Sequence, residues 1–285
     1  MTAISVVIAT RNRAPKLNSC LSYIKKMKTS VPWELIVVDN ASTDATPEVL
    51  RTFEQSAPFP VTVVTEPVPG LGRAHNKGWT IAKAEIIAFT DDDCYVLPSF
   101  LDETLRVFTD PKIGYCGGRI LLHSPDDYPL TIKESTVPEV FPPFSYLSAG
   151  TIHGANMIFR RRALEDIGGF DQAFGPGTPF NCEDVDACAR ASFAGWWGVF
   201  APGPSVRHAH GRKAPDIPAL RRGHSIGEGA YTAKLILRSD TRRCYLRSWF
   251  RQLSGRLIRQ GRRREALYEI QGAIRYCSHR VASLF

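Results

Sequence analysis

The sequence has no feature that would place it across a membrane or hold it together with disulfides. No apolar run approaches the roughly 20 residues that a helix needs to span a bilayer. The chain also lacks a charged leader with a cleavage site, because a core-like apolar run begins at Ile4. The seven cysteines are odd in number, scattered, and include no Cys-x-x-Cys pair, which argues against a disulfide framework or a zinc site. We therefore expect a cytoplasmic protein.

Glycine is missing from the segment between Ala9 and Pro15, which follows the first predicted strand. A dinucleotide oxidoreductase would need Gly-x-Gly-x-x-Gly at this place, so that class is disfavoured. A nucleotidyltransferase acting on sugar phosphates would also need a basic, glycine-rich loop here to bind a triphosphate. Arg11 and Arg13 supply the charge without the glycines. This second class stays open as an alternative.

Negative charge is scarce toward the end of the chain. Residues 206–285 contain 18 lysines and arginines against 5 acidic residues, a net charge of +13, so residues 1–205 carry −5 of the total of +8. We predict an acidic domain followed by a basic, helical tail. Such a tail can meet anionic lipid, nucleic acid or an acidic partner, or it can be a solvated helical face. Aromatic residues do not interleave with its arginines as a stacking platform requires, so we expect no nucleic-acid partner.

The remaining composition is that of a globular protein, with 44% hydrophobic and 10% aromatic residues. Short β-branched runs alternate with stretches of helical spacing in the first third of the chain. Strands are predicted at residues 4–9, 35–38, 61–64 and 85–89, with helices between them. This alternation predicts an α/β fold, in which helices cover both faces of a mostly parallel, Rossmann-like sheet.

The second part of the chain is less regular. Residues 123–150 are rich in Pro, Ser and Asp and predict a long loop, which in a compact domain is often functional. Helices are predicted at 162–168 and 183–195, and a short strand at 197–200. Beyond Pro218 the spacing is helical, with arginine at many exposed positions.

Polar residues gather where the predicted strands end. The segments are Thr10-Arg11-Asn12-Arg13 after the first strand, Asp39-Asn40 after the second, Gly70-Leu71-Gly72-Arg73 beyond the third, and Thr90-Asp91-Asp92-Asp93 after the fourth. Open α/β sheets bind ligands in the crevice at the carboxyl ends of their strands. The four segments therefore predict one binding crevice at this edge of the sheet.

The acidic triplet Asp91, Asp92 and Asp93 is the strongest single signal. Three adjacent carboxylates repel one another unless a cation or basic neighbours compensate them, and oxygen ligands favour Mg²⁺ or Mn²⁺. In extended backbone, residues 91 and 93 point the same way and residue 92 the opposite way. We expect Asp91 and Asp93 to share a nucleotide and its metal, and Asp92 to bond the scaffold. The alternative is an acidic turn before the helix that follows Pro98.

With these residues the chain resembles glycosyltransferase family 2, whose fold is called GT-A. The resemblance covers about residues 3–210 and includes an Asp-x-Asp signature at 90–93. Seven segments match in the expected order: residues 5–13, 38–46, 70–78, 90–93, 154–160, 168–171 and 183–186. The family implies a GT-A catalytic domain over residues 1–212. Residues 1–122 would bind the nucleotide sugar and residues 123–212 the acceptor, and residues 213–285 form the basic helical extension.

The resemblance implies roles for residues on the nucleotide side. Asp39 would accept a hydrogen bond from the base, with Thr10 and Arg13 near the base and ribose. Arg73 would lie near the diphosphate, since a guanidinium suits phosphate geometry. Asn76 would orient the same turn. The alternatives are an Asx-turn for Asp39 and a solvated helix start for Arg73.

Metal binding and catalysis are assigned in the same way. Asp91 would contact ribose and metal, and Asp93 would coordinate a metal that bridges the two phosphates. Asp184 would act as the general base that deprotonates the acceptor, so that attack inverts the anomeric carbon. Burial, or Glu183 and Asp186 nearby, would raise the pKa of Asp184. The alternative is that these carboxylates merely favour the positive end of a helix.

Histidine and tryptophan complete the expected site. In family members a histidine near this point reaches the metal or phosphates, and His208 matches that place better than His210. Trp197 is expected to stack on a sugar ring, although core packing is an alternative for it. His153 could sit beside the sugar, or be an incidental loop residue.

The expected reaction moves a sugar from a nucleotide diphosphate sugar, most simply UDP-linked, to a hydroxyl of a glycan or lipid-linked saccharide. Mn²⁺ or Mg²⁺ is the expected cofactor. The basic helices would hold the enzyme at an anionic membrane surface. Alternatively, a homo-oligomer interface would form from Leu235, Ile236, Trp249, Phe250, Leu253 and Leu257. A non-catalytic module that binds nucleic acid or membrane would leave the acidic segments without a role.

Overall fold

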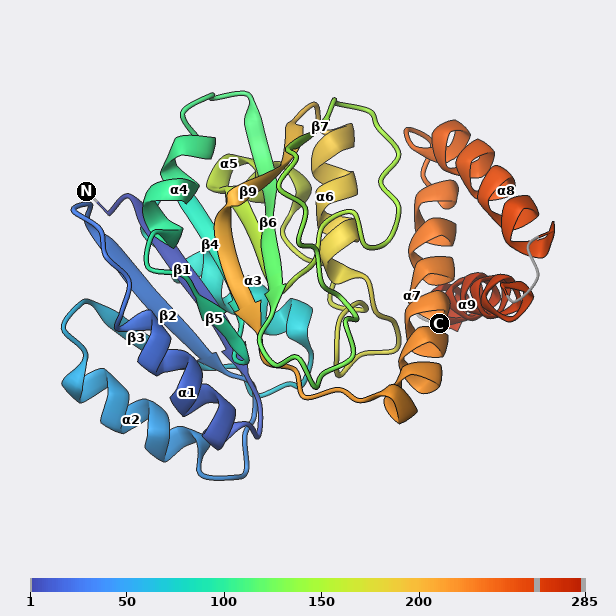
Figure 1. The fold of residues 1–285 in the computed structure, drawn as a ribbon. Coiled ribbons are helices and arrows are strands. Elements are labelled where there is room, and N and C mark those ends of the chain that lie inside the picture. Colours follow the sequence, from blue (N-terminus) through green and yellow to red (C-terminus); the bar gives the residue numbers. More distant parts are fainter. Residues whose placement is uncertain (1, 259–261, 283–285) are drawn as a thin grey trace.

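The computed structural model describes residues 2–258 and 262–282 and shows a central sheet between layers of helices (Figure 1). The first four strands run parallel in the order β3-β2-β1-β4. They are β1 (Ile4–Thr10), β2 (Trp33–Asp39), β3 (Val61–Thr65) and β4 (Ile86–Asp91). Their carboxyl ends meet at one edge, as predicted.

The sheet continues beyond β4 with mixed direction, in the order β8-β6-β9-β5. β8 (Asn156–Arg160) is antiparallel to both β4 and β6 (Ile113–Leu122). β9 (Trp197–His208) runs parallel to β6, and the short strands β5 (Cys94–Val96) and β7 (Glu139–Phe141) pair antiparallel with β9. The predicted mixed α/β fold with helices on both faces of the sheet is confirmed.

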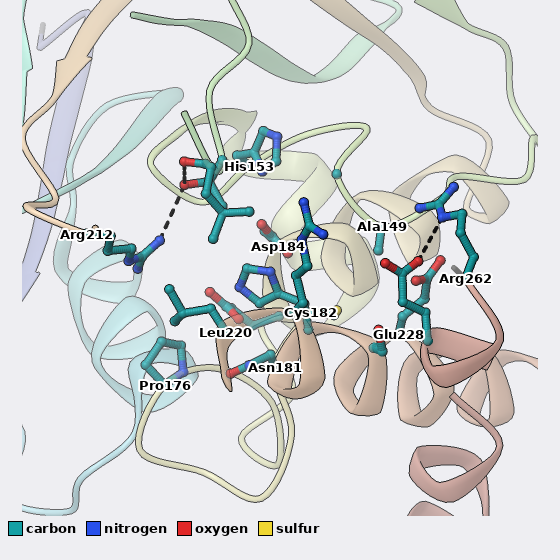
Figure 2. Close-up of a pocket in the computed structure, with 18 of the residues that line it drawn as sticks. Ala149, His153, Pro176, Asn181, Cys182, Asp184, Arg212, Leu220, Glu228 and Arg262 are labelled. Atoms are coloured by element: carbon teal, nitrogen blue, oxygen red, sulfur yellow. Dashed lines mark hydrogen bonds and ion pairs between the residues drawn. The ribbon is translucent and has the colours of Figure 1, made fainter. Parts of the chain in front are cut away.

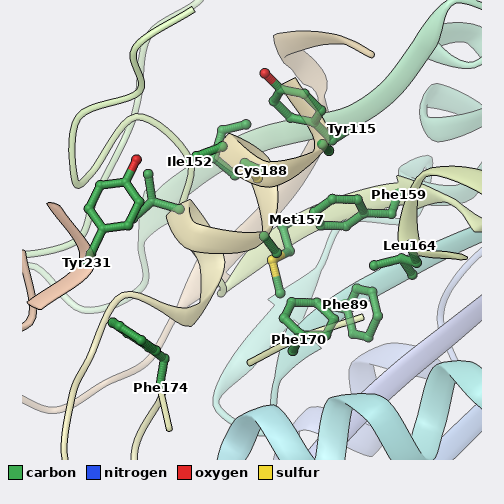
Figure 3. Packing of buried hydrophobic residues seen from close by; sticks show 14 of the residues in the cluster. Phe89, Tyr115, Ile152, Met157, Phe159, Leu164, Phe170, Phe174, Cys188 and Tyr231 are labelled. Carbon is green, nitrogen blue, oxygen red and sulfur yellow. The ribbon is translucent and has the colours of Figure 1, made fainter. Parts of the chain in front are cut away.

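Alternating side chains of the strands form two hydrophobic cores, one on each face of the sheet. Val6 and Ile8 of β1 pack with one set of helices, and Val7 packs with the other. The first set is α1 (Ala14–Ile24), α2 (Thr46–Ser56) and α4 (Phe100–Val107). The second set is α3 (Leu71–Ile81), α5 (Arg161–Ile167) and α6 (Glu183–Phe193). Figure 3 shows the second core, where Phe89, Phe159 and Phe170 pack around Met157.

The C-terminal helices extend the second core. They are α7 (Ile217–Leu237), α8 (Arg242–Ile258) and α9 (Arg263–Ala282), preceded by a short 3₁₀ helix at Ala214–Asp216. The hydroxyl of Tyr231 in α7 donates to the carbonyl of Leu147 at 2.7 Å and accepts from the hydroxyl of Tyr245 at 2.7 Å. α7 and α9 cross so closely that a Cβ on Gly229 would lie 1.8 Å from the carbonyl oxygen of Glu269. These helices therefore share a continuous core with the sheet.

Two predicted boundaries differ from the structure. β9 continues to His208 instead of ending at residue 200, because its ladder with β6 resumes at Ser205 after skipping Pro202 and Pro204, which have no backbone N–H. β4 ends at Asp91, so residues 92 and 93 lie in a turn and not in extended backbone.

Candidate active site

A cavity of about 440 Å³ opens at the carboxyl ends of β1, β2 and β4. Its walls come from the four strand-end segments that the sequence singled out, together with residues of the acceptor-side half. The lining includes Thr10, Arg13, Asn40, Gly70, Asp91, Asp92, Asp93, His153, Glu183, Asp184, His208 and Arg212. The predicted crevice therefore exists, and residues far apart in the sequence share it.

The acidic triplet is compensated by Arg13, which directly precedes α1, and by Lys16 in the first turn of α1. Arg13 donates from Nε to Asp92 at 3.1 Å and from its other nitrogen to Asp93, while the ammonium of Lys16 lies 3.5 Å from Asp93. Thr10 donates its hydroxyl to Asp92 at 2.7 Å. Asp92 thus bonds the scaffold as expected, but the predicted reason fails because the turn, not strand alternation, sets the direction of its side chain.

The triplet carboxylates differ sharply in pKa. Burial, together with the negative charge of Asp93, raises the pKa of Asp91 to about 7. Burial also opposes ionisation of Asp93, but the hydrogen bond and charge of His208, with Arg13 and Lys16, hold the pKa of Asp93 below its ordinary value. Within residues 2–258 and 262–282, no side chain hydrogen-bonds the Asp91 carboxylate, so this oxygen pair is free for a ligand.

The donor set fits a divalent cation. One ligand atom each of Asp91, Asp93, Cys94 and His208 lies within 4.8 Å of the others. Burial raises the pKa of the Cys94 thiol well above its ordinary value, which makes it a poor ligand beside two carboxylates. Two carboxylates and an imidazole suit Mn²⁺ or Mg²⁺.

His208 reaches the triplet and His210 does not. The Nε2 atom of His208 lies 3.2 Å from Asp93. His210 instead faces Asp127 at 3.7 Å and accepts a hydrogen bond of 3.0 Å from the backbone N–H of Arg212. The end of β9 therefore brings His208, the histidine that its position in the sequence favoured, to the triplet, and leaves His210 beside Asp127.

A second cavity of about 900 Å³ adjoins the first. Its far wall is formed by α7 and by residues around the start of α9, including Arg221, His224, Glu228 and Arg262. Figure 2 shows Asp184 between Arg212 on one side and Glu228 and Arg262 on the other. Glu183 and Asp184 line both cavities, so they lie where the two spaces meet.

Asp184 is held at this junction by backbone donors. The N–H of Gly154 donates to Oδ2 at 2.8 Å and the N–H of Val185 to Oδ1 at 2.7 Å. Burial raises the pKa of Asp184 although these hydrogen bonds oppose the rise. Burial and the neighbouring Asp184 raise the pKa of Glu183 well above its ordinary value.

Asp186 does not belong to the site. Its buried carboxylate pairs with Arg190 at 2.8 Å and with Lys234 of α7 at 2.6 Å. Burial opposes ionisation of Asp186, but these two cations lower its pKa. Asp186 therefore anchors α7 to α6, and burial is the main cause of the raised pKa of Asp184.

Two predicted substrate-binding residues lie away from both cavities. Asn76 bonds the backbone of Phe170 through both amide atoms, at 2.8 Å each, and so joins α3 to the segment before α6. Trp197 is at the start of β9, at the opposite end of the strand from His208. The amide of Asn76 is therefore used by the fold, and Trp197 lies far along the strand from the acidic triplet.

Two further predicted residues flank the first cavity without lining it. Asp39 is buried at the end of β2, where its Oδ1 accepts a hydrogen bond of 3.1 Å from the N–H of Ser42, which is the Asx-type turn named as an alternative. Arg73 lies in the first turn of α3, behind the cavity-lining Gly70. Asn40 lines the cavity and joins its own loop to the loop between β3 and α3: its amide donates to the carbonyls of Glu66 and Val68 and accepts from the N–H of Gly70.

Sequence reasoning missed Arg212 and His224, which line both cavities. Burial and Arg212 lower the pKa of His224, and burial with nearby cations lowers the pKa of His153 to about 4. No motif marks Arg212 or His224, because only the approach of α7 to the sheet brings them to Asp184. His153, which the sequence left undecided, lines both cavities as well.

Comparison with known proteins agrees with this geometry. The sequence profile described as "Glycosyl transferase family 2" matches residues 5–168. The chain is 24% identical to the glycosyltransferase AglE of Haloferax volcanii over 85% of this chain and 77% of the relative. It is 25% identical to the O-antigen chain rhamnosyltransferase WbaN of Salmonella anatum over 74% of this chain and 67% of the relative.

Solved structures show the same fold. The mannosyltransferase PcManGT from Pyrobaculum calidifontis, solved in complex with GDP-Man and Mn²⁺, has a TM-score of 0.66 at 18% identity, covering 96% of this chain and 86% of that one. S. aureus TarS 1–349 in complex with UDP-GlcNAc has a TM-score of 0.58 at 14% identity, covering 98% and 92%.

Proposed function

The chain belongs to glycosyl transferase family 2 and is a glycosyltransferase, and we propose that it transfers a sugar from a nucleotide diphosphate sugar to an acceptor hydroxyl with inversion. The observation that supports this most is the position of Asp184, which lines both the cavity of the acidic triplet and the larger cavity beside α7. A donor in the first space and an acceptor in the second would meet at this carboxylate.

The smaller cavity is the proposed donor site. Asp91, Asp93 and His208 would hold Mn²⁺ or Mg²⁺, which would neutralise charge as the nucleotide diphosphate departs. Arg13 contributes a guanidinium beside the same carboxylates. Asp39, at the end of the neighbouring strand, is proposed to contact the base. PcManGT with GDP-Man and TarS with UDP-GlcNAc support a nucleotide sugar donor, and UDP is the first nucleotide to test.

Asp184 is the proposed general base. Its raised pKa suits a group that takes a proton near neutral pH, and its backbone donors fix the direction of the carboxylate. The acceptor oxygen would lose its proton to Asp184 while it bonds to the anomeric carbon from the face opposite the leaving diphosphate. That geometry inverts the configuration of the transferred sugar.

Nucleotide binding with and without Mn²⁺ tests the proposal. We expect one nucleoside diphosphate to bind more tightly with Mn²⁺, and a screen of nucleotide sugars for metal-dependent hydrolysis to identify the donor. Release of pyrophosphate from a nucleoside triphosphate and a sugar phosphate would instead identify a nucleotidyltransferase. If no nucleotide binds better with metal while nucleic acid binds in a salt-sensitive way, the assignment is overturned.

We also propose that α8 contacts an anionic membrane surface. No helix in the described ranges 2–258 and 262–282 is long and apolar enough to cross a bilayer. α8 exposes Leu246, Phe250 and Leu257, which recur on one side of the helix and are 50%, 75% and 43% accessible. Arg243 and Arg247 lie beside this apolar stripe and are also exposed. An exposed apolar stripe bordered by cations suits the interface of an anionic leaflet.

Sedimentation with vesicles tests this surface. We expect binding to phosphatidylglycerol vesicles that weakens with salt, little binding to phosphatidylcholine, and weaker binding of Phe250→Ser. Val137→Ser is the control, because Val137 is similarly exposed at 67% but lies in the loop of the acceptor-side half. Equal behaviour of the two variants would exclude α8 as the membrane contact.

The C-terminal helices expose less apolar surface for a homo-oligomer interface than the sequence suggested. Leu235 is fully buried in the second core, and Ile236 and Trp249 pack against it. Only Phe250 and Leu257 of that proposed interface are strongly exposed.

A further inference from the structure

The larger cavity is lined by four arginines, two of which are already paired with carboxylates. Arg256 pairs with Glu228 at 3.0 Å and with Glu269, and Arg262 pairs with Glu265 at 2.9 Å. These pairs tie α7, α8 and α9 together along the wall. They therefore stabilise the cavity and offer little charge to a ligand.

Arg212 and Arg221 have no such partner. Among residues 2–258 and 262–282, neither guanidinium lies within 4.0 Å of a carboxylate, and their side-chain contacts are only with hydroxyls. Arg212 meets the Thr131 hydroxyl at 3.5 Å and Arg221 meets the Tyr128 hydroxyl at 3.4 Å. Both arginines line the larger cavity, one from the segment after β9 and the other from the first turns of α7.

The segment that bears Arg212 is fixed in place. Asp127 accepts from the N–H of Gly211 at 3.0 Å and from the ammonium of Lys213 at 2.8 Å. The N–H of Tyr128 donates to the carbonyl of Arg212 at 2.8 Å. The backbone is therefore held on both sides of Arg212, and the same loop presents the hydroxyl that Arg221 touches.

The acidic residues of this cavity do not balance the two arginines. Glu228 and Glu265 are paired with other arginines. Glu183 is buried, and burial together with Asp184 raises its pKa well above the ordinary value, which disfavours a negative charge there. Asp184 already accepts two backbone hydrogen bonds. Two unpaired guanidiniums therefore face one space, which favours an anionic ligand.

We propose that the larger cavity binds the acceptor and that Arg212 and Arg221 bind a phosphate group on that acceptor. This proposal rests on the glycosyl transfer proposed above and names the acceptor class: a hydroxyl compound bearing a phosphate monoester or a diphosphate. Arg212 lies at the junction, where the donor diphosphate would also come near. Arg221 lines only the larger cavity, so it distinguishes acceptor binding from donor binding.

Binding of phosphate-bearing probes in the presence of EDTA tests this assignment, because chelation removes metal-dependent binding at the donor site. Glucose 1-phosphate is compared with methyl glucoside, and farnesyl diphosphate with farnesol. We expect the phosphorylated member of at least one pair to bind roughly tenfold more tightly than its neutral counterpart. Preference in the first pair indicates a soluble sugar phosphate, and preference in the second indicates a lipid diphosphate.

Arg221→Gln should abolish that preference. Arg222→Gln is the matched control, because Arg222 is the next residue of α7 and lies over the Tyr268 ring at 5.5 Å without lining either cavity. Equal binding of phosphorylated and neutral probes, or equal binding by the two variants, would overturn the acceptor proposal. Nucleotide binding with Mn²⁺, measured separately on the unmodified protein, tests the glycosyl transfer itself, so the two failures are distinguishable.

Discussion

The backbone N–H of Gly154 donates a hydrogen bond of 2.8 Å to Oδ2 of Asp184, and this contact joins the acceptor-side loop to the first turn of α6. It aims the carboxylate at the junction of the two cavities. Because burial raises the pKa of Asp184, the group can take a proton near neutral pH. The first predictions concern this carboxylate.

Asp184→Asn should lower turnover by about 100-fold or more, because the amide cannot accept the acceptor proton. Donor binding should remain, since Asp184 makes no hydrogen bond or ion pair with the acidic triplet within residues 2–258 and 262–282. Steady-state turnover and nucleotide titration measure the two effects. Asp126→Asn, an exposed carboxyl outside both cavities, should behave like the unmodified enzyme. Near-native turnover of Asp184→Asn would place the base elsewhere.

The dependence of activity on pH should also identify Asp184 as the general base. A base works only when it is deprotonated, so activity should fall as the pH drops through the raised pKa of Asp184. The pH at which kcat/KM falls on the acid side should therefore lie above the ordinary pKa range of a carboxylate. The residual activity of Asp184→Asn should show no such fall. An acid limb that persists unchanged in this variant would assign the titration to another group.

The sequence predicted the chemistry of the site better than its packing. The family and the GT-A fold were predicted from ordered segments and are confirmed, because strand ends and acidic motifs are local patterns. Arg212 and His224 could not be predicted, since they reach Asp184 only through the path of the chain between β9 and α7. Trp197 has chemistry that suits a sugar, but it lies at the start of β9, at the other end of the strand from His208.

The acidic triplet is a second example of packing that the sequence alone does not predict. The sequence identified the cluster, but the opposed directions of Asp91 and Asp92 were inferred from extended backbone that ends at residue 91. The turn that follows brings Arg13 onto both Asp92 and Asp93. A short polar segment does not reveal where a strand stops, because the hydrogen bonds that decide it come from neighbouring strands.

Asp93→Asn should remove metal-dependent nucleotide binding. The variant keeps the shape of the side chain but loses the charge that faces His208 and Lys16, so the cation would have one carboxylate fewer. Calorimetric titration with a nucleoside diphosphate, with and without Mn²⁺, measures the change. Asp126→Asn should retain the metal effect. A variant Asp93→Asn that still binds more tightly with Mn²⁺ would refute the ligand role of Asp93.

Lys234→Met should destabilise the fold by about 3 kcal/mol or more, the scale of breaking one partner out of a buried ion pair. The ammonium of Lys234 bridges Asp171 at 2.7 Å and Asp186 at 2.6 Å, and its loss leaves the fully buried Asp186 with Arg190 alone. Urea unfolding measures the free energy.

Arg238→Met is the matched control for this ion pair, at the end of the same helix. Arg238 pairs with Asp240 at 2.7 Å, but both side chains are 40% or more accessible, so its removal should cost less than about 1 kcal/mol. Because Lys234 joins α7 to α6, its replacement should also loosen the wall of the larger cavity and raise the KM for the acceptor more than the KM for the donor. Equal stability of the two variants would mean that α7 is held by its apolar contacts with the core and not by this buried charge.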